Sequence, residues 1–115
     1  MNLQPRITIR LFCNDHEKGF GPGIAELLDR ISVSGSLRAA CSEMNMSYSK
    51  GWSILKSCEK SLGFALIERT TGGEDGGGST VTDNGKKMLK CFRQLERQLN
   101  EEGKRLIQEQ FGNIL

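Results

Sequence analysis

The feature that most constrains the fold of this chain is a pair of short helical segments separated by a very short turn. Ser36 can cap the first segment by accepting a hydrogen bond from a free first-turn N–H, and apolar residues then recur at helical spacing as far as Met44. Asn45 adopts a positive φ at low cost, so it is expected at the centre of the turn. Ser47 can cap the second segment, which Gly63 ends. Two helices joined in this way are typical of a helix-turn-helix.

The second of these helices has two distinct faces. An apolar stripe at helical spacing predicts an inward face made of Gly51, Ile54, Cys58 and Leu62. The residues left facing outward are short and polar or basic: Ser49, Lys50, Ser53, Ser57 and Lys60. A helix with such an outward face can approach an anionic surface closely.

The flanking segments complete a small mixed domain. Residues 6–12 alternate between apolar and other side chains, which predicts a first strand, and a helix with one apolar face follows from Ile24 to Gly35. Residues 65–70 and 79–82 have strand character on either side of a glycine-rich tip. Thr82 can cap a long final helix over residues 83–112. We expect residues 1–115 to form one domain that is mainly α with a small β-sheet, a winged helix-turn-helix with a long C-terminal dimerisation helix.

Composition narrows the class of protein. With 37% hydrophobic and 26% charged residues the chain resembles ordinary globular proteins, and it has neither a long apolar run nor a secretory leader, so we expect a cytoplasmic location and no membrane association. The four cysteines form no Cys-x-x-Cys pair, which predicts reduced, buried thiols. Cys13 and His16 have the spacing of half a metal site without a second half. No catalytic constellation is present, so neither an enzyme nor a cofactor is expected.

The charge is small overall but unevenly distributed. The net charge is +2, and residues 36–70 hold five basic and three acidic side chains, while the segments before and after them balance. A second basic run opens the final helix with Lys86, Lys87, Lys90, Arg93 and Arg97. We interpret Lys90, Arg93 and Arg97 as a solvated face and leave Lys86 and Lys87 open, because they lie close to the hairpin.

Three short sequences carry a resemblance to a known family. These are MSYSKGW at residues 46–52, LIERTTGG at 66–73 and GGG at 76–78, followed by Val81, Thr82 and Gly85. Over roughly residues 20–100 the chain resembles the N-terminal DNA-binding domain of the ModE-type, molybdate-responsive bacterial transcription regulators, and in outline the LysR-type regulators. The resemblance implies a sequence-specific regulator of transcription that binds double-stranded DNA. In the family a separate C-terminal domain binds molybdate, and because this chain stops soon after its long helix, we expect it not to bind molybdate by itself.

The residues expected to contact DNA are mostly in the first two turns of the second motif helix, which normally enter the major groove. Lysine and arginine side chains there and at the hairpin base can neutralise phosphate. Whether the Tyr48 hydroxyl contacts phosphate or packs on Trp52 stays open, and Trp52 is interpreted as packing support. Glu74 and Asp75 in the hairpin tip would repel phosphate, so Arg69 is the preferred contact there. The full predicted set is Ser47, Tyr48, Ser49, Lys50, Ser53, Lys56, Arg69 and Lys86.

The final helix is too long for so small a domain to cover. Its apolar residues near heptad spacing therefore predict a homodimer interface, formed by Phe92, Leu95, Leu99 and Leu106. A twofold dimer would place two recognition helices about 34 Å apart, which is one DNA turn.

Two alternatives come from other functional classes. The first is a protein-interaction module of the same fold that has lost DNA binding, suggested by the acidic hairpin tip and the modest charge. The second is a thiol-based redox sensor using Cys41 or Cys58, which would require an accessible cysteine of low pKa. Both cysteines are expected to face inward, which predicts slow alkylation of the native protein.

Overall fold

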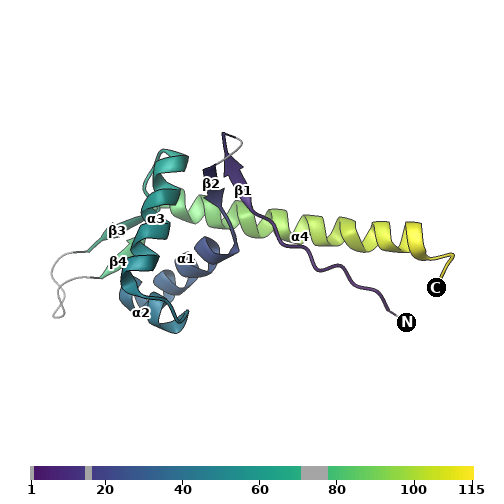
Figure 1. The fold of residues 1–115 in the computed structure, drawn as a ribbon, viewed down its shortest axis with the longest axis horizontal. Coiled ribbons are helices and arrows are strands. Elements are labelled where there is room, and N and C mark those ends of the chain that lie inside the picture. The colour runs from purple at the N-terminus through teal and green to yellow at the C-terminus, as the bar shows by residue number, and fades with distance from the viewer. Residues whose placement is uncertain (1, 15–16, 71–77) are drawn as a thin grey trace.

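The computed structural model describes residues 2–14, 17–70 and 78–115, which form four helices and two small antiparallel sheets (Figure 1). The chain order is β1 (Leu11–Cys13), β2 (Glu17–Phe20), α1 (Pro22–Ser34), α2 (Leu37–Glu43), α3 (Tyr48–Leu62), β3 (Ile67–Arg69), β4 (Ser79–Val81) and α4 (Asp83–Phe111). Helices α1, α2 and α3 pack together at one end of α4, whose other end projects away. The molecule therefore measures 62 × 31 × 24 Å. The expected fold class is confirmed.

Local hydrogen bonds define the helix-turn-helix as the sequence predicts. The Ser36 hydroxyl accepts the Ala39 N–H at 3.0 Å, and the Ser47 hydroxyl accepts the Lys50 N–H at 3.1 Å. Asn45 lies at φ 56° in the turn between α2 and α3. Gly35 and Gly63 end α1 and α3 in the left-handed conformation, at φ 70° and 87°.

The two helices of the motif cross at a point where only a glycine fits. A Cβ built on Gly51 in α3 would lie far inside van der Waals contact of the Cys41 Sγ atom in α2, and Cys41 is 1% exposed. The Met46 sulfur would lie 3.6 Å from the same Cβ, so the turn also closes over this point. The close approach of α2 and α3 therefore depends on the missing side chain of Gly51.

A single core joins the motif to the first and last helices. Phe20 of β2 and Phe92 of α4 pack edge to face with ring centroids 5.1 Å apart. Leu55 supplies the most buried α3 side chain, whereas Ile54 and Leu62 of the predicted stripe are only partly buried. The other core side chains are Ile24, Ala25, Leu27, Leu28, Ile31, Leu37, Ala40, Cys41, Cys58, Leu66, Ile67 and Val81.

The predicted hairpin is present and is fixed to the motif. Ile67 pairs with Val81 and Arg69 with Ser79, and the Ser79 N–H donates to the Gly35 carbonyl at 2.7 Å. This bond ties β4 to the turn between α1 and α2. The tip, with Glu74 and Asp75, lies outside the described residues.

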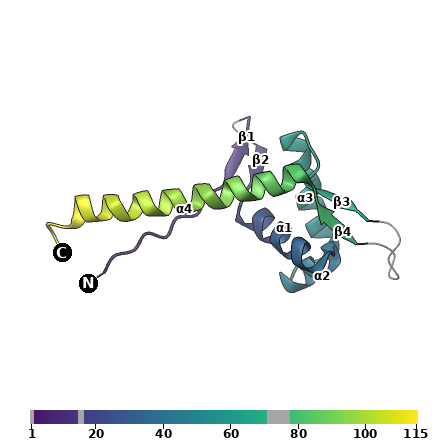
Figure 2. The ribbon, with the colours of Figure 1, turned by 180° about the vertical axis from the view of Figure 1, so that it is seen from behind.

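The N-terminal strand differs from the prediction. Only Leu11–Cys13 pairs, with a strand β2 that the sequence analysis missed because it treated the glycines around Phe20 as a break. Helix α1 begins at Pro22, so β2 ends before it can reach residues 6–10. Those residues instead run beside α4 (Figures 1 and 2).

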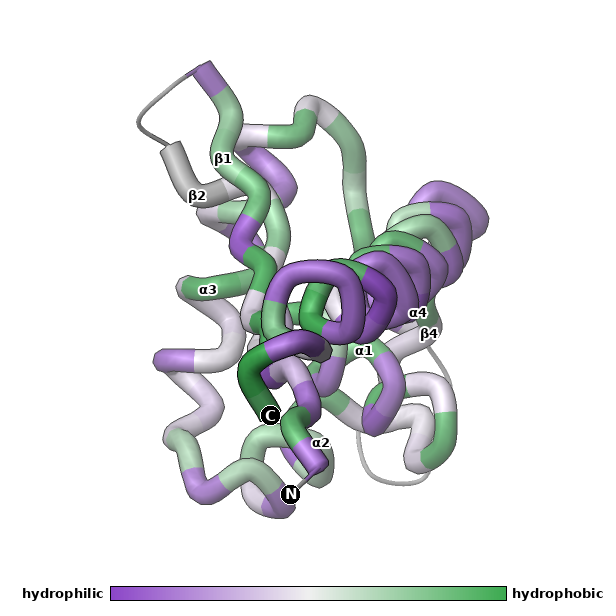
Figure 3. The backbone as a smooth tube through the Cα atoms, turned by 90° about the vertical axis from the view of Figure 1, so that its right-hand side faces the viewer, coloured by the Kyte–Doolittle hydropathy of each residue, from purple (hydrophilic) through white to green (hydrophobic). Residues whose placement is uncertain are grey.

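Helix α4 follows its prediction to within one residue, with the Thr82 hydroxyl accepting the Gly85 N–H at 2.9 Å. Seen along this helix, hydrophilic and hydrophobic residues alternate around it, and the last residues of the chain are strongly hydrophobic (Figure 3). No helix in the described part of the chain is long and apolar enough to cross a membrane.

One predicted interface residue is wrong, and of the four thiols predicted to be buried, Cys13 is half-buried and Cys91 is exposed. Phe92 is 1% exposed within its own protomer, because α4 turns it toward Phe20, so it is unavailable to a second copy. Cys91, next to it in sequence, is exposed rather than buried, since it lies on the opposite side of that turn.

The helix crossing can be tested with alanine at Gly51. We expect Gly51→Ala to lower the free energy of unfolding by about 1–3 kcal/mol, because the new methyl overlaps the buried Cys41 sulfur. Urea denaturation measures this change. Gly23→Ala is the matched control: nothing lies within 4 Å of its added Cβ, so it should be neutral or stabilising by up to about 1 kcal/mol.

The double variant Gly51→Ala/Cys41→Ala should lose less stability than the two single changes added together, because the clash is then removed. A Gly51→Ala protein as stable as the wild type would contradict the proposed close crossing.

Candidate nucleic-acid interface

The beginning of α3 is accessible along its predicted polar face. Seven of the eight predicted DNA-binding side chains are exposed and Tyr48 is half-buried. Together with β3 and β4, this part of α3 lies at the end of the molecule opposite the free end of α4 (Figure 1). The accessible face therefore sits beside the hairpin, away from the projecting helix.

Two aromatic rings and three cations form a cluster across this surface, made of Arg38, Tyr48, Trp52, Lys56 and Arg69. The rings of Tyr48 and Trp52 stack at a centroid distance of 6.4 Å and an interplanar angle of 20°. They stand four residues apart on α3, as the spacing predicts. We call this group the aromatic–cation cluster.

The cations of the cluster lie against ring faces. The Arg38 guanidinium is 4.5 Å from the Tyr48 centroid, while the Lys56 ammonium and the Arg69 guanidinium are 4.4 and 4.8 Å from the Trp52 centroid. Electron-rich ring faces attract cations and partly offset the repulsion among them. The cluster thus holds positive charge from α2, α3 and β3 on one surface.

One hydrogen bond joins the hairpin directly to α3. The Arg69 Nη2 atom donates to the Tyr48 hydroxyl at 3.0 Å. The tyrosine oxygen keeps its own hydrogen as a donor, so the Arg69 contact does not use up its capacity to reach a phosphate oxygen. Tyr48 therefore packs its ring against Trp52 and also keeps its hydroxyl available to an external acceptor.

Glu59 anchors the end of α3 to the start of β3. Its carboxylate accepts the N–H groups of Leu66 and Ile67 at 2.7 and 3.3 Å and the Lys56 ammonium at 2.9 Å, and its side chain is only 11% exposed. Burial raises the pKa of this carboxyl, but the Lys56 ammonium and the two N–H groups outweigh burial and hold the pKa below its usual range. The charged carboxylate consequently fixes where the hairpin leaves α3.

Arg38 and Glu59 were not predicted from the sequence. Arg38 could have been noticed as the basic residue nearest the start of α2, but its contact with Tyr48 depends on the angle between the two helices. Nothing in the sequence marks Glu59 as an anchor, because its partners are backbone groups of a segment that only the fold brings back to α3.

The remaining cations differ in whether they have acidic partners. Within the described ranges neither Lys50 nor Lys86 forms an ion pair, whereas Arg93 is bound to Asp29 and Glu96 at 2.7 and 2.9 Å. The interpretation of Arg93 as part of an ordinary solvated face fits this pairing. Among the residues that the structure describes, no acidic side chain therefore competes with an external anion for Lys50 or Lys86.

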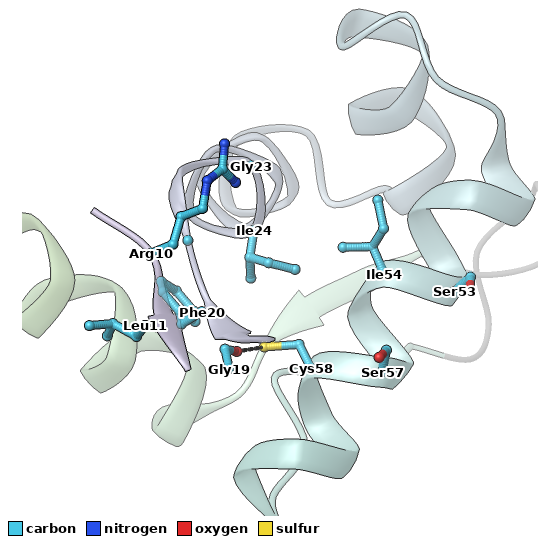
Figure 4. Close-up of a pocket in the computed structure, with 11 residues that line it drawn as sticks. Arg10, Leu11, Gly19, Phe20, Gly23, Ile24, Ser53, Ile54, Ser57 and Cys58 are labelled. Carbon is cyan, nitrogen blue, oxygen red and sulfur yellow. Dashed lines mark hydrogen bonds between the residues drawn. The ribbon is translucent and has the colours of Figure 1, made fainter. Parts of the chain in front are cut away.

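A hollow of about 390 Å³ lies beside the outward polar face of α3 (Figure 4). Ser53, Ser57 and Cys58 line one side, and Arg10 of the N-terminal segment lines the other. The Cys58 thiol donates a hydrogen bond to the Gly19 carbonyl at its base. Ser53 thus stands at the rim, with its hydroxyl accessible.

The buried cysteines lack the properties of redox sensors. Burial raises the pKa of the Cys58 thiol to about 11, with smaller contributions from Cys13 and Glu59. Burial also raises the pKa of Cys41, against an opposing effect of Arg38. Both thiols therefore stay protonated and face inward, as expected, which argues against the redox alternative.

Metal binding receives no support from the described residues, where no group of three or more histidine, cysteine, aspartate or glutamate side chains converges. Cys13 is half-buried in β1, and His16 lies outside the described residues.

Comparison with known proteins shows which family of proteins this part of the chain matches. The family described as "Bacterial regulatory helix-turn-helix protein, lysR family" matches residues 25–86, from α1 to the first turn of α4. The match contains the whole helix-turn-helix and the hairpin, and its members are regulators rather than enzymes. This agrees with the expectation that the chain is not an enzyme.

Individual relatives point to the same kind of protein. "Molybdenum transport protein ModE" of Herbaspirillum seropedicae is 39% identical over 71 residues, 62% of this chain and 26% of that protein. "Transcriptional regulator ModE" of Haemophilus influenzae is 34% identical over 76 residues, 66% of this chain and 30% of that protein. "DNA-binding transcriptional dual regulator ModE" of Escherichia coli is 30% identical over 71 residues, 62% of this chain and 27% of that protein. The similarity thus spans about a quarter to a third of each relative.

The role of Glu59 predicts a pH-dependent stability. At pH 7 Glu59→Gln should lower the free energy of unfolding by about 1–3 kcal/mol, because a charged acceptor of buried N–H groups is lost. A folded-state pKa below the unfolded value near 4.3 means that the wild-type advantage is complete above about pH 4.3 and disappears as the pH falls through the folded value. Denaturant titrations between about pH 7 and pH 2.5 measure the difference.

Glu43→Gln is the control for this experiment, since it breaks only a half-exposed ion pair with Arg30 and should cost less than about 1 kcal/mol. A difference between wild type and Glu59→Gln that is the same at every pH would refute the anchoring role.

Proposed function

The chain belongs to the lysR family of bacterial regulatory helix-turn-helix proteins, and on that basis we propose that it controls transcription by inserting α3 into the major groove of duplex DNA. The observation that carries the proposal is the exposed start of α3 beside the aromatic–cation cluster. Short side chains let the helix approach base edges, and the neighbouring cations neutralise the phosphates on either side. Molybdenum, which the name of the Herbaspirillum seropedicae relative mentions, is outside the proposal because the similarity covers only 26% of that protein.

The proposed contacts divide into two classes. Lys50, Lys56, Arg69 and Lys86, with Arg38 added from the structure, contact phosphates, and the Tyr48 hydroxyl contacts a phosphate oxygen. The Ser47 hydroxyl accepts the Lys50 N–H in the first turn of α3, and Ser47 approaches the DNA backbone. Ser49 and Ser53 face base edges. Lys56 shares its charge with Glu59 and should contribute less than Lys50.

A homodimer is the proposed assembly. Leu99 and Leu106 are 38% and 37% exposed and Leu95 is half-buried, on the part of α4 that projects from the rest of the domain. A helix of 29 residues is about 44 Å long, so a second copy can cover this face without obstructing α3. A twofold axis through α4 would then present two α3 helices about 34 Å apart to an imperfect palindrome, inside the cytoplasm.

Membership of the regulatory family disfavours the alternative of an interaction module that has lost DNA binding. The acidic residues that suggested this alternative, Glu74 and Asp75, lie outside the described residues. The basic surface of α3 and β3 does not depend on them.

The division of contacts can be tested by measuring affinity at several salt concentrations. Lys50→Ala should weaken binding to all duplexes alike and reduce the slope of log K against log salt by about one unit, because one phosphate contact is lost. Fluorescence anisotropy with operator and random duplexes measures both quantities. Lys104→Ala, an exposed change of the same charge on distal α4, is the matched control and should leave the slope unchanged.

In the same assay Ser49→Ala and Ser53→Ala should change the preference among sequences while leaving the salt slope intact. An equal loss on all sequences for both serines would contradict their assignment to base edges. Absence of DNA affinity in the wild type at low salt would overturn the proposed function.

A further inference from the structure

The N-terminal segment has the sequence of a strand, but no strand among the described residues pairs with residues 3–9. A Cβ built on Gly103 of α4 would lie 3.1 Å from Ile7 and 3.2 Å from Pro5, so these side chains face α4. Ile9 and Leu11 pack against the core. The odd-numbered side chains from Pro5 to Leu11 therefore lie on the side toward the protein, as the alternation predicts for a half-buried strand, and Ile7 still remains 38% exposed.

The backbone of residues 3–9 has no hydrogen-bond partner in the part of the chain that the structure describes. Within residues 2–14, 17–70 and 78–115, no backbone hydrogen bond involves residues 3–9. The hairpin cannot supply a partner, because β2 ends at Phe20 and Pro22 begins α1. An extended segment with free N–H and C=O groups on both edges is a template for pairing with another strand.

Exposed apolar side chains surround the segment on both elements. Figures 1 and 2 show it alongside the projecting part of α4, and a space of about 270 Å³ between them is lined by Leu3, Ile107 and Phe111. The exposed fractions of apolar side chains on the two elements are Leu3 40%, Ile7 38%, Leu99 38%, Leu106 37% and Phe111 43%. The segment and the projecting part of α4 beside it thus both carry exposed apolar side chains.

We infer that, in the homodimer proposed above, residues 6–10 of the two copies pair as antiparallel strands beside the α4 interface. The inference rests on that homodimer. A second copy is the fitting partner because a twofold axis brings the same surface of each copy together, so each segment supplies the strand that the other lacks. Antiparallel pairing of two identical segments also closes the assembly at two chains, while the apolar residues of α4 become covered in the same step.

Amide hydrogen exchange followed by NMR tests this pairing. In an antiparallel ladder every second residue directs its N–H to the neighbouring strand. At concentrations where sedimentation shows a dimer, either the amides of residues 6, 8 and 10 or those of residues 7 and 9 should exchange at least tenfold more slowly than in an unstructured peptide. Uniformly fast exchange of residues 6–10 in the dimer would overturn the inference while leaving the dimer intact.

A monomeric variant shows whether protection comes from the second copy. Leu99→Glu/Leu106→Glu should abolish the dimer and the protection together, whereas Val33→Glu, at a 90% exposed apolar residue on α1, should change neither. Protection that persists in the monomer would place the hydrogen bonds within one chain and contradict the inference. A wild type that stays monomeric at every concentration would overturn both the homodimer and the pairing, and affinity for a single half-site would then show separately whether DNA binding stands.

Discussion

The contact between α2 and α3 at Gly51 and Cys41 determines what the rest of the structure can do. Helices with side chains at their crossing point stay 8–10 Å apart, and a glycine there allows the two backbones to approach more closely. Cys41 fills the space that this glycine leaves, and Met46 closes the turn beside it. The direction in which α3 leaves the domain is therefore set by one missing side chain, and the direction of α3 decides which of its residues reach solvent.

The cationic surface is a consequence of that helix direction. Arg38 reaches the Tyr48 ring from α2, and Arg69 reaches both aromatic residues from β3, so neither contact could form if α3 were tilted differently. The aromatic faces hold the cations close together, and Glu59 fixes the hairpin from which Arg69 projects. An anion approaching this surface meets charge that is already positioned, so little side-chain entropy remains to be lost on binding.

The sequence was most informative where structure is local. The caps at Ser36, Ser47 and Thr82 and the left-handed residues Gly35, Asn45 and Gly63 depend on neighbours within a few residues, and all are confirmed. These signals were enough to define the motif and the long helix.

Features that depend on tertiary neighbours were mispredicted or missed. The alternation of residues 6–12 correctly indicated which side chains face the protein, but it could not reveal that β2 is too short to pair with them. Phe92 fits the heptad pattern as well as Leu99 does, and only the position of Phe20 separates a core residue from an exposed one. Arg38 and Glu59 escaped prediction because their partners are distant in sequence.

The proposed function requires the start of α3 and the aromatic–cation cluster to form the DNA-binding surface together. Amide chemical-shift mapping by NMR, with a duplex titrated into the protein at low salt, tests it most directly. We expect the largest shifts on residues 47–56 and on Arg38 and Arg69, with the free end of α4 unaffected. Shifts concentrated elsewhere, with residues 47–56 unchanged at saturation, would contradict it.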